Sequence, residues 1–169
     1  MIILRWLISA ALLFVVLDIT TAADAAEQTA AVKGAAARSI ERGRYVVKIS
    51  GCNDCHTAGY AMSGGSVPEK TWLTGDHLGW RGPWGTTYAR NLRRFMSAIT
   101  EDEWVKLAHT AQFRPPMPWF ALRDMSEADL RSVYRFVRQL GPVGEQVPDY
   151  VPPDREPAGP ASRPKANEE

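Results

Sequence analysis

The sequence predicts an all-α fold with three to four helices and long loops. Residues 101–111 and 127–140 each follow side chains that cap helices, and in both segments apolar residues recur at helical spacing. A third segment with this spacing, residues 37–49, precedes the two cysteines. Residues 57–97 carry no sustained helix or strand pattern. A loop of this length in a compact domain is usually functional or wraps a bound group.

Size and charge narrow the classes of function. The 169 residues suffice for one domain with terminal extensions. The formal net charge is only +1, so the chain lacks the charge excess of a nucleic-acid-binding protein, and we expect no nucleic-acid partner.

The N-terminus has the order of a secretory signal peptide. Arg5 precedes an apolar run at residues 6–17, and small residues follow at 21–26. We therefore expect a signal peptide over residues 1–25, cleaved after Ala23 or Ala25. The alternative is an uncleaved N-terminal anchor that associates with the membrane, although the run is shorter than the ~20 residues that a spanning helix needs.

The first helix of the mature chain is expected from Ala37 to Ile49, after a loose lead-in at residues 24–36. Gly43 lies in its interior, where glycine costs about 1 kcal/mol relative to alanine. This position predicts that another backbone or ring comes close to the helix; simple tolerance of the glycine is the alternative.

The motif Cys52-Asn53-Asp54-Cys55-His56 is the C-x-x-C-H pattern of covalent haem attachment. Two cysteines three apart on one turn can both reach the vinyl edge of a porphyrin, and the next residue projects an imidazole at the iron. These are the only two cysteines in the chain. The motif predicts one covalently bound haem c, and this group would replace much of the ordinary core.

Three other interpretations of the cysteine pair are weaker. A thioredoxin-like redox pair needs a βαβ context, which the pattern lacks. A zinc knuckle needs four ligands, so His77 or His109 would have to complete it. A structural disulfide would be strained across so short a loop.

The long loop offers apolar and polar partners for a haem. Its large apolar residues can pack on the porphyrin or form ordinary core; they are Trp72, Leu73, Leu78, Trp80, Trp84 and Tyr88. An indole N–H or a guanidinium suits a haem propionate, which gives four candidates: Trp80, Arg81, Trp84 and Arg90.

A run of arginines without acidic residues lies in the same loop. It comprises Arg81, Arg90, Arg93 and Arg94. These side chains could form a basic patch that steers an acidic redox partner to the haem edge. Alternatively, they bind propionates or lie solvated on the surface.

The helix expected after Thr100 begins with a capping box, in which Thr100 is the N-cap and Glu103 reaches back. Its apolar positions are Trp104, Leu107, Ala108 and Ala111. His109 lies off this stripe, which indicates a surface residue rather than a metal ligand.

Met117 is the candidate sixth ligand of the iron. Prolines at 115, 116 and 118 hold it on a stiff loop, where a weak thioether ligand would be kept in place. Met/His ligation raises the reduction potential of a haem. Filling a core gap is the alternative role, and the rival ligands are Met62, Met96, Met125, His77 and His109.

Ser126 and Asp129 repeat a capping signature and start the last helix, which Gly141-Pro142 ends. Its apolar face is Leu130, Val133, Tyr134, Val137 and Leu140. Residues 144–169 are rich in proline and lack apolar periodicity, which predicts a flexible tail, extended over the surface or disordered.

The order of these features resembles class I cytochromes c, and the cytochrome domain would cover residues 37–143. Within that class, residues 85–92, the Met117-Pro118 pair and residues 125–130 are similar to the cytochrome subunits of bacterial periplasmic dehydrogenases. Those subunits are often multihaem, whereas this chain has one haem motif.

The resemblance implies roles for particular residues. Cys52 and Cys55 would form the thioether bonds, with His56 as proximal and Met117 as distal ligand. It also implies that the first helix crosses the last near Gly43 and Tyr134.

The leading functional hypothesis is a periplasmic electron carrier that cycles between Fe(III) and Fe(II) and is not an enzyme. Its partners would be redox proteins, with a dehydrogenase as donor and an oxidase or another cytochrome as acceptor. One alternative is a relay subunit of a dehydrogenase complex, tethered by the proline-rich tail. The other is a haem enzyme or gas sensor with an open distal site.

Overall fold

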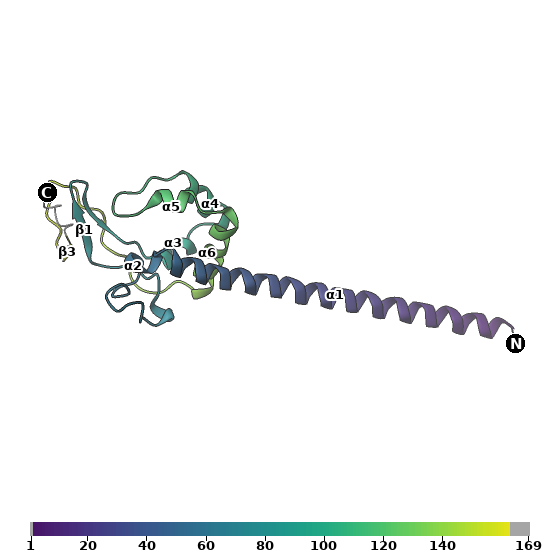
Figure 1. The fold of residues 1–169 in the computed structure, drawn as a ribbon. Helices are drawn as coiled ribbons and strands as arrows, with labels where there is room; N and C mark the ends of the chain where they lie inside the picture. Colours follow the sequence, from purple (N-terminus) through teal and green to yellow (C-terminus); the bar gives the residue numbers. More distant parts are fainter. Residues whose placement is uncertain (1, 163–169) are drawn as a thin grey trace. The chain divides into compact units, whose positions relative to one another are not determined.

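The computed structural model describes residues 2–162 and is mainly helical, with a helix content of 50% (Figure 1). Within these residues there are six α-helices, one short 3₁₀ helix and a three-stranded mixed sheet. In chain order they are α1 (Ile2–Ile49), α2 (Cys52–His56), η1 (Glu69–Thr71), β1 (Gly79–Gly82), β2 (Gly85–Tyr88), α3 (Leu92–Ser97), α4 (Glu101–Thr110), α5 (Trp119–Arg123), α6 (Glu127–Leu140) and β3 (Ala161–Ser162). The helical class is confirmed, but the small sheet corrects the expectation of an all-α fold.

The chain divides into two compact units, residues 1–38 and residues 39–169. In the first unit, the described residues are part of α1, so residues 24–36 are helical rather than a loose lead-in. Many of them are alanine, the residue with the highest helix propensity. None of the helices searched in the described residues is long and apolar enough to cross a membrane. The signal peptide over residues 1–25 stays a prediction.

In the second unit, the C-terminal part of α1 packs closely against α6 at Gly43. A Cβ atom at this position would lie 1.9 Å from the carbonyl oxygen of Ser132 and 2.8 Å from Cβ of Phe136. The close approach predicted at Gly43 is therefore confirmed. The contact is made by Ser132 and Phe136, whereas Tyr134 turns its hydroxyl to the carbonyl of Ile99, 2.8 Å away.

An ion pair and a hydroxyl contact accompany this crossing. Arg42 of α1 donates two hydrogen bonds to the carboxylate of Asp129 in α6, at 2.7 and 3.2 Å. The hydroxyls of Ser39 and Ser132 lie 3.2 Å apart. The guanidinium of Arg42 holds the pKa of Asp129 below its usual range.

This pKa shift predicts how stability depends on pH. Because the folded state lowers the pKa of Asp129, the carboxylate stabilises the fold above its unfolded pKa of about 4, and the contribution is lost as pH falls through the folded value. Asp129→Asn should therefore lower the denaturation midpoint near pH 7 and have a smaller effect near pH 3. Urea denaturation of both proteins at the two pH values checks this; an equal difference at both would contradict it.

Helices α4 and α6 are capped as the sequence predicts. Thr100 Oγ1 accepts the N–H of Glu103, and the Glu103 carboxylate accepts the N–H of Thr100 at 2.7 Å. Ser126 Oγ accepts the N–H of Asp129, and α6 ends before Gly141, whose φ is 72°. The two helices pack together, and Trp104 Nε1 donates to the carbonyl of Leu130 across the contact.

The loop at residues 57–97 contains more regular structure than its sequence indicates. Strands β1 and β2 form an antiparallel hairpin in which Gly79 pairs with Tyr88 and Gly82 with Gly85. Asn91 caps α3 by accepting the N–H of Arg94. Each strand has four residues, which is too short to establish a clear alternation, and α3 has only six.

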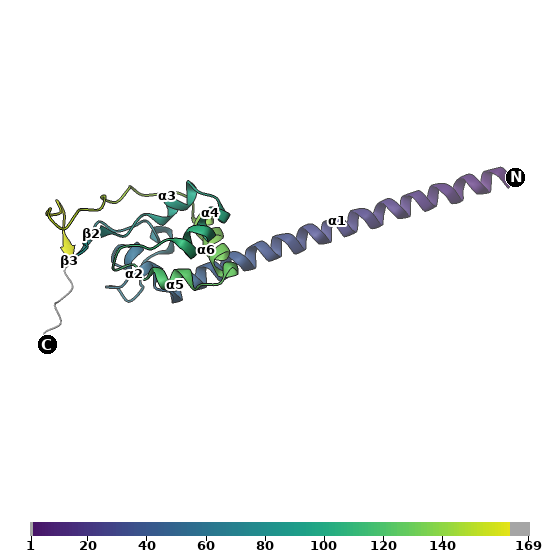
Figure 2. The same cartoon turned by 90° about the horizontal axis from the view of Figure 1, so that it is seen from above.

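Residues 143–162, the C-terminal strap, are extended and hydrogen-bonded to the domain. Strand β3 pairs in parallel with β1, beside which it lies in Figure 1, and Figure 2 shows β3 at the end of this segment. Val151 exchanges two backbone hydrogen bonds with Thr86, and Asn91 donates to the carbonyl of Val143. Val147 is buried. Of the two courses expected for the tail, the described part takes the extended one; residues 163–169 lie outside the described residues.

The core joins α1, α3, α4 and α6 with the loop before the hairpin. Trp72 and Leu73 are buried in it, and Trp72 packs edge-on against Tyr60 and Phe136. The remaining apolar loop residues are half-buried or exposed. The buried apolar residues are Val46, Val47, Trp72, Leu73, Met96, Trp104, Val105, Ala108, Leu130, Val133, Phe136 and Val137.

Candidate functional site

The C-x-x-C-H motif forms one turn of helix, α2. Gly51 precedes it with a φ of 69°, a left-handed conformation that glycine adopts without strain and that redirects the chain after α1. Cys52 and Cys55 are three residues apart, so their thiols project from one side of the turn. Both are free thiols. Burial raises the pKa of Cys52 to about 11 and raises the pKa of Cys55 too, so both sulfurs are protonated at neutral pH.

The imidazole of His56 is held by a backbone carbonyl. Its Nδ1 lies 2.7 Å from the carbonyl oxygen of Arg90. A carbonyl can only accept, so we assign the proton to Nδ1, which leaves the lone pair of Nε2 free. Burial also lowers the pKa of His56, partly opposed by the Arg90 carbonyl, and favours the neutral ring. A neutral imidazole fixed through its other nitrogen is the typical form of a metal-ligating histidine.

The turn is fixed on both sides of His56. Thr57 Oγ1 donates to Asn53 Oδ1 at 2.7 Å and accepts the N–H of Leu73 at 2.8 Å. The carbonyl of His56 accepts the N–H of Gly75 at 2.8 Å. The loop at residues 73–75 therefore anchors the end of α2, while Arg90 anchors the ring.

The four candidate propionate ligands have different surroundings. Trp84 Nε1 is buried and has no hydrogen-bond partner among the described residues, and its indole lies over the backbone of Gly82. Leaving a buried donor unsatisfied costs about 1–3 kcal/mol, so this N–H suits an absent acceptor. Arg81 instead donates to the strap, at the carbonyl of Arg155 and the carboxylate of Glu156. Its guanidinium already has these partners.

The other two candidates are more open. Trp80 is half-buried in β1. The guanidinium of Arg90 is exposed and lies 5.2 Å from the ring centre of Phe95. Arg90 does approach the motif, but through its backbone carbonyl on His56.

Most arginines of the predicted basic patch donate hydrogen bonds within the protein. Arg93 is buried and donates to the carbonyls of Lys70, Leu140 and Gly141, which satisfies the end of α6. Burial lowers its pKa. Arg94 donates to the carbonyl of Gly144, and Arg81 is held by the strap. The sequence reveals four nearby charges but not that three of them bind backbone carbonyls.

Met117 is half-buried on the loop between α4 and α5. Its N–H donates to the carbonyl of Arg114 at 3.3 Å, and its carbonyl accepts the N–H of Trp119 at 2.9 Å. The hydroxyl of Thr87 in β2 donates to the carbonyl of Pro115 at 2.7 Å. The loop is thereby joined to the hairpin that leads to Arg90.

The rival ligands have other surroundings. Met96 is fully buried in the core, and Met125 is partly buried and packs against the core. Met62 is 93% exposed and His77 is exposed. His109 places its Nδ1 2.8 Å from the carbonyl of Arg123.

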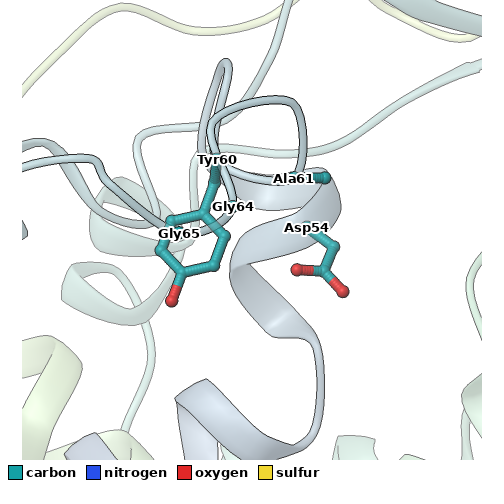
Figure 3. A pocket seen from close by; sticks show the side chains of 5 residues that line it. All are labelled: Asp54, Tyr60, Ala61, Gly64 and Gly65. Carbon is teal, nitrogen blue, oxygen red and sulfur yellow. The ribbon is translucent and has the colours of Figure 1, made fainter.

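A separate cavity lies beside α2, as Figure 3 shows. Its volume is about 320 Å³, and it is lined by Asp54, Tyr60, Ala61, Gly64 and Gly65. The two thiols and His56 do not line it. Among the described residues, no three His, Cys, Asp or Glu side chains are grouped so that they could hold a metal ion, so the zinc-knuckle interpretation gains no fourth ligand.

Two contacts at the candidate site were not expected from the sequence. One is the carbonyl of Arg90 on His56, and the other is the hydroxyl of Thr87 on the Met117 loop. A backbone carbonyl leaves no mark in side-chain identity, so no sequence pattern could have revealed the first.

Comparisons of the chain with protein-family models, curated proteins and solved structures found no match. The resemblance to class I cytochromes c is therefore carried by the motifs alone.

Proposed function

We propose that the protein is an exported, monohaem electron carrier of the class I cytochrome c type. Cys52 and Cys55 would hold one haem c covalently, and His56 and Met117 would be its axial ligands. Haem bound in this way supplies an Fe(III)/Fe(II) couple whose reduction potential is raised by the Met/His pair.

The single observation that carries this proposal is the state of the His56 ring. The residue directly after the two thiols has Nδ1 engaged by the carbonyl of Arg90 and Nε2 left with a free lone pair. Ligating histidines are held in this way because the second hydrogen bond fixes the tautomer and orients the ring. A redox-active cysteine pair or a structural disulfide does not require a histidine held in this way directly after the second thiol.

Three further observations support the same group. The two free thiols project from the same turn as His56. The buried N–H of Trp84, which has no partner among the described residues, suits a propionate oxygen. The crossing of α1 and α6 at Gly43 agrees with the helix contact that the resemblance implies.

Electron transfer, rather than catalysis, follows from how the axial positions would be filled. With His56 and Met117 both committed to the iron, no position remains for a substrate. The protein's own contribution is to hold these two side chains still, to limit water around them and to present a surface to redox partners. A dehydrogenase as donor and an oxidase or another cytochrome as acceptor are the expected partners, met in the periplasm.

Expression in bacteria that attach haem c in the periplasm tests the proposal directly. We expect a red protein whose mass includes one haem and lacks the signal peptide. The alkaline pyridine spectrum should show thioether-linked haem, and the reduced protein should be reoxidised by a partner cytochrome. A colourless secreted protein with two alkylatable thiols would refute the proposal.

Met117→Ala provides the test of the distal ligand. The haem should stay attached, because the thioether bonds and His56 are untouched. The reduced variant should bind carbon monoxide readily. Its reduction potential should fall because the methionine sulfur no longer binds the iron. Absorption spectroscopy and redox titration measure both changes.

Met62→Ala is the matched control, since Met62 is 93% exposed. It should leave the spectrum and the potential unchanged. If Met117→Ala had the spectrum of the wild type, the ligand would be a different residue.

A further inference from the structure

The loop that carries Met117 has few attachments to the rest of the domain. Its backbone hydrogen bonds near Met117 are local: the N–H of Met117 donates to the carbonyl of Arg114, and the N–H of Trp119 donates to the carbonyl of Met117. Within the described residues, the hydrogen bond that joins residues 111–118 to a distant element is the one from Thr87 to Pro115. The prolines restrict the loop internally, but they do not fix it to its surroundings.

The second attachment comes from the C-terminal strap. The guanidinium carbon of Arg114 lies 3.9 Å from the ring centre of Tyr150. This is the shortest of the cation–π contacts in the described chain. Arg114 is three residues before Met117, and its backbone carbonyl accepts the N–H of Met117. Fixing the position of Arg114 therefore also restrains the methionine.

Tyr150 is itself firmly placed. Its hydroxyl donates to the carbonyl of Trp84 at 2.8 Å, and the next residue, Val151, exchanges two hydrogen bonds with Thr86. A Cβ at Gly85 would lie 2.4 Å from the carbonyl oxygen of Val151, so the strap lies directly on the hairpin backbone. The ring of Tyr150 is therefore a fixed surface rather than a mobile side chain.

We infer that Tyr150 is a positioning residue for Met117: its ring, fixed on the hairpin by the strap, holds Arg114 and with it the loop that presents the methionine to the iron. The inference depends on the proposed function, since it assigns a role toward the axial ligand proposed above. Under this inference the proline-rich segment positions an axial ligand within the domain, rather than tethering the protein to a dehydrogenase complex. Thr87 of β2 is the other anchor, and it binds the carbonyl of Pro115, the residue after Arg114.

The test uses the full-length, haem-loaded protein and its Tyr150→Leu variant. Removing the ring should enlarge the population in which Met117 has left the iron. We expect carbon monoxide to bind the reduced variant about twofold to fivefold faster than the wild type, the range that corresponds to loss of an exposed cation–π contact. The sulfur-to-iron absorption band of the oxidised form should weaken. Tyr150→Phe keeps the ring beneath Arg114 but loses the hydrogen bond to Trp84, so its effect should be smaller than that of Tyr150→Leu.

Tyr45→Leu is the matched control, because Tyr45 makes the same kind of contact with Arg42, at 5.3 Å, within α1. It should leave carbon monoxide binding unchanged. In addition, Arg114→Leu should act like Tyr150→Leu, and the double variant should show little further change.

Two results would overturn the inference. One is a Tyr150→Leu variant that binds carbon monoxide at the wild-type rate and keeps its absorption band. The other is an equal increase in Tyr45→Leu, which would indicate general destabilisation. Either leaves the proposed function standing, whereas a wild type without covalent haem, or without the sulfur-to-iron band, would refute the proposed ligation and this inference together.

Discussion

Gly43→Ala is expected to destabilise the domain severely. The added methyl carbon would lie 1.9 Å from the carbonyl oxygen of Ser132 and 2.5 Å from its carbonyl carbon. These are backbone atoms of α6, so no side-chain rotation can relieve the clash, and α1 must move away from α6. Overpacking of this kind costs about 1–3 kcal/mol, and we expect the upper end or more. That is a large part of the 5–15 kcal/mol that stabilises a typical domain.

Thermal denaturation followed by circular dichroism measures the effect. A loss of about 3 kcal/mol should lower the melting temperature by about 6–12 °C in a domain of this size. The yield of haem-loaded protein should fall as well, because α2 directly follows the displaced end of α1.

Gly34→Ala supplies the matched control on the same helix. The nearest atom to its added carbon is Nη1 of Arg38 at 3.3 Å, the movable end of a flexible side chain. Alanine is favoured over glycine in a helix by about 1 kcal/mol, so this variant should be at least as stable as the wild type. Equal stability of the two variants would show that α1 and α6 are not in close contact at Gly43.

His56→Ala is expected to abolish stable haem-loaded protein. The substitution removes the Nε2 lone pair that would bind the iron and the N–H that satisfies the carbonyl of Arg90. Changing only an outer partner of a metal ligand typically costs tenfold to a hundredfold in metal affinity, so removing the ligand itself should cost more. We expect the ratio of haem absorbance to protein to fall by at least about tenfold.

His109→Ala tests whether the loss is specific to the ligand. His109 also places Nδ1 against a backbone carbonyl, that of Arg123, at 2.8 Å, so the two substitutions remove similar hydrogen bonds. The His109 variant should keep its haem and its spectrum. A His56→Ala protein that accumulates with the wild-type haem content would exclude His56 as the proximal ligand.

The helix caps and the close approach at Gly43 could be predicted from the sequence because each prediction depends on residues close together in the chain. The capping box at Thr100 and the N-cap at Ser126 form as predicted, since an N-cap needs only a side chain and the N–H three residues later. The approach at Gly43 was also predicted, because glycine inside a helix is costly without a packing reason. The hairpin and α3 were not, because four to six residues are too few for periodicity to emerge.

The sequence by itself determined the chemistry of the candidate site: two cysteines and a histidine on one turn, and a methionine between prolines. Only the tertiary structure decided which groups hold them. The carbonyl of Arg90 lies on His56, and Tyr150 of the strap lies on Arg114. The physical reason is that both contacts are long-range: His56 and the carbonyl of Arg90 are 34 positions apart, and Arg114 and the ring of Tyr150 are 36 apart. Every residue has a backbone carbonyl and the chain has many aromatic rings, so the sequence does not indicate which carbonyl or ring makes the contact; folding decides this.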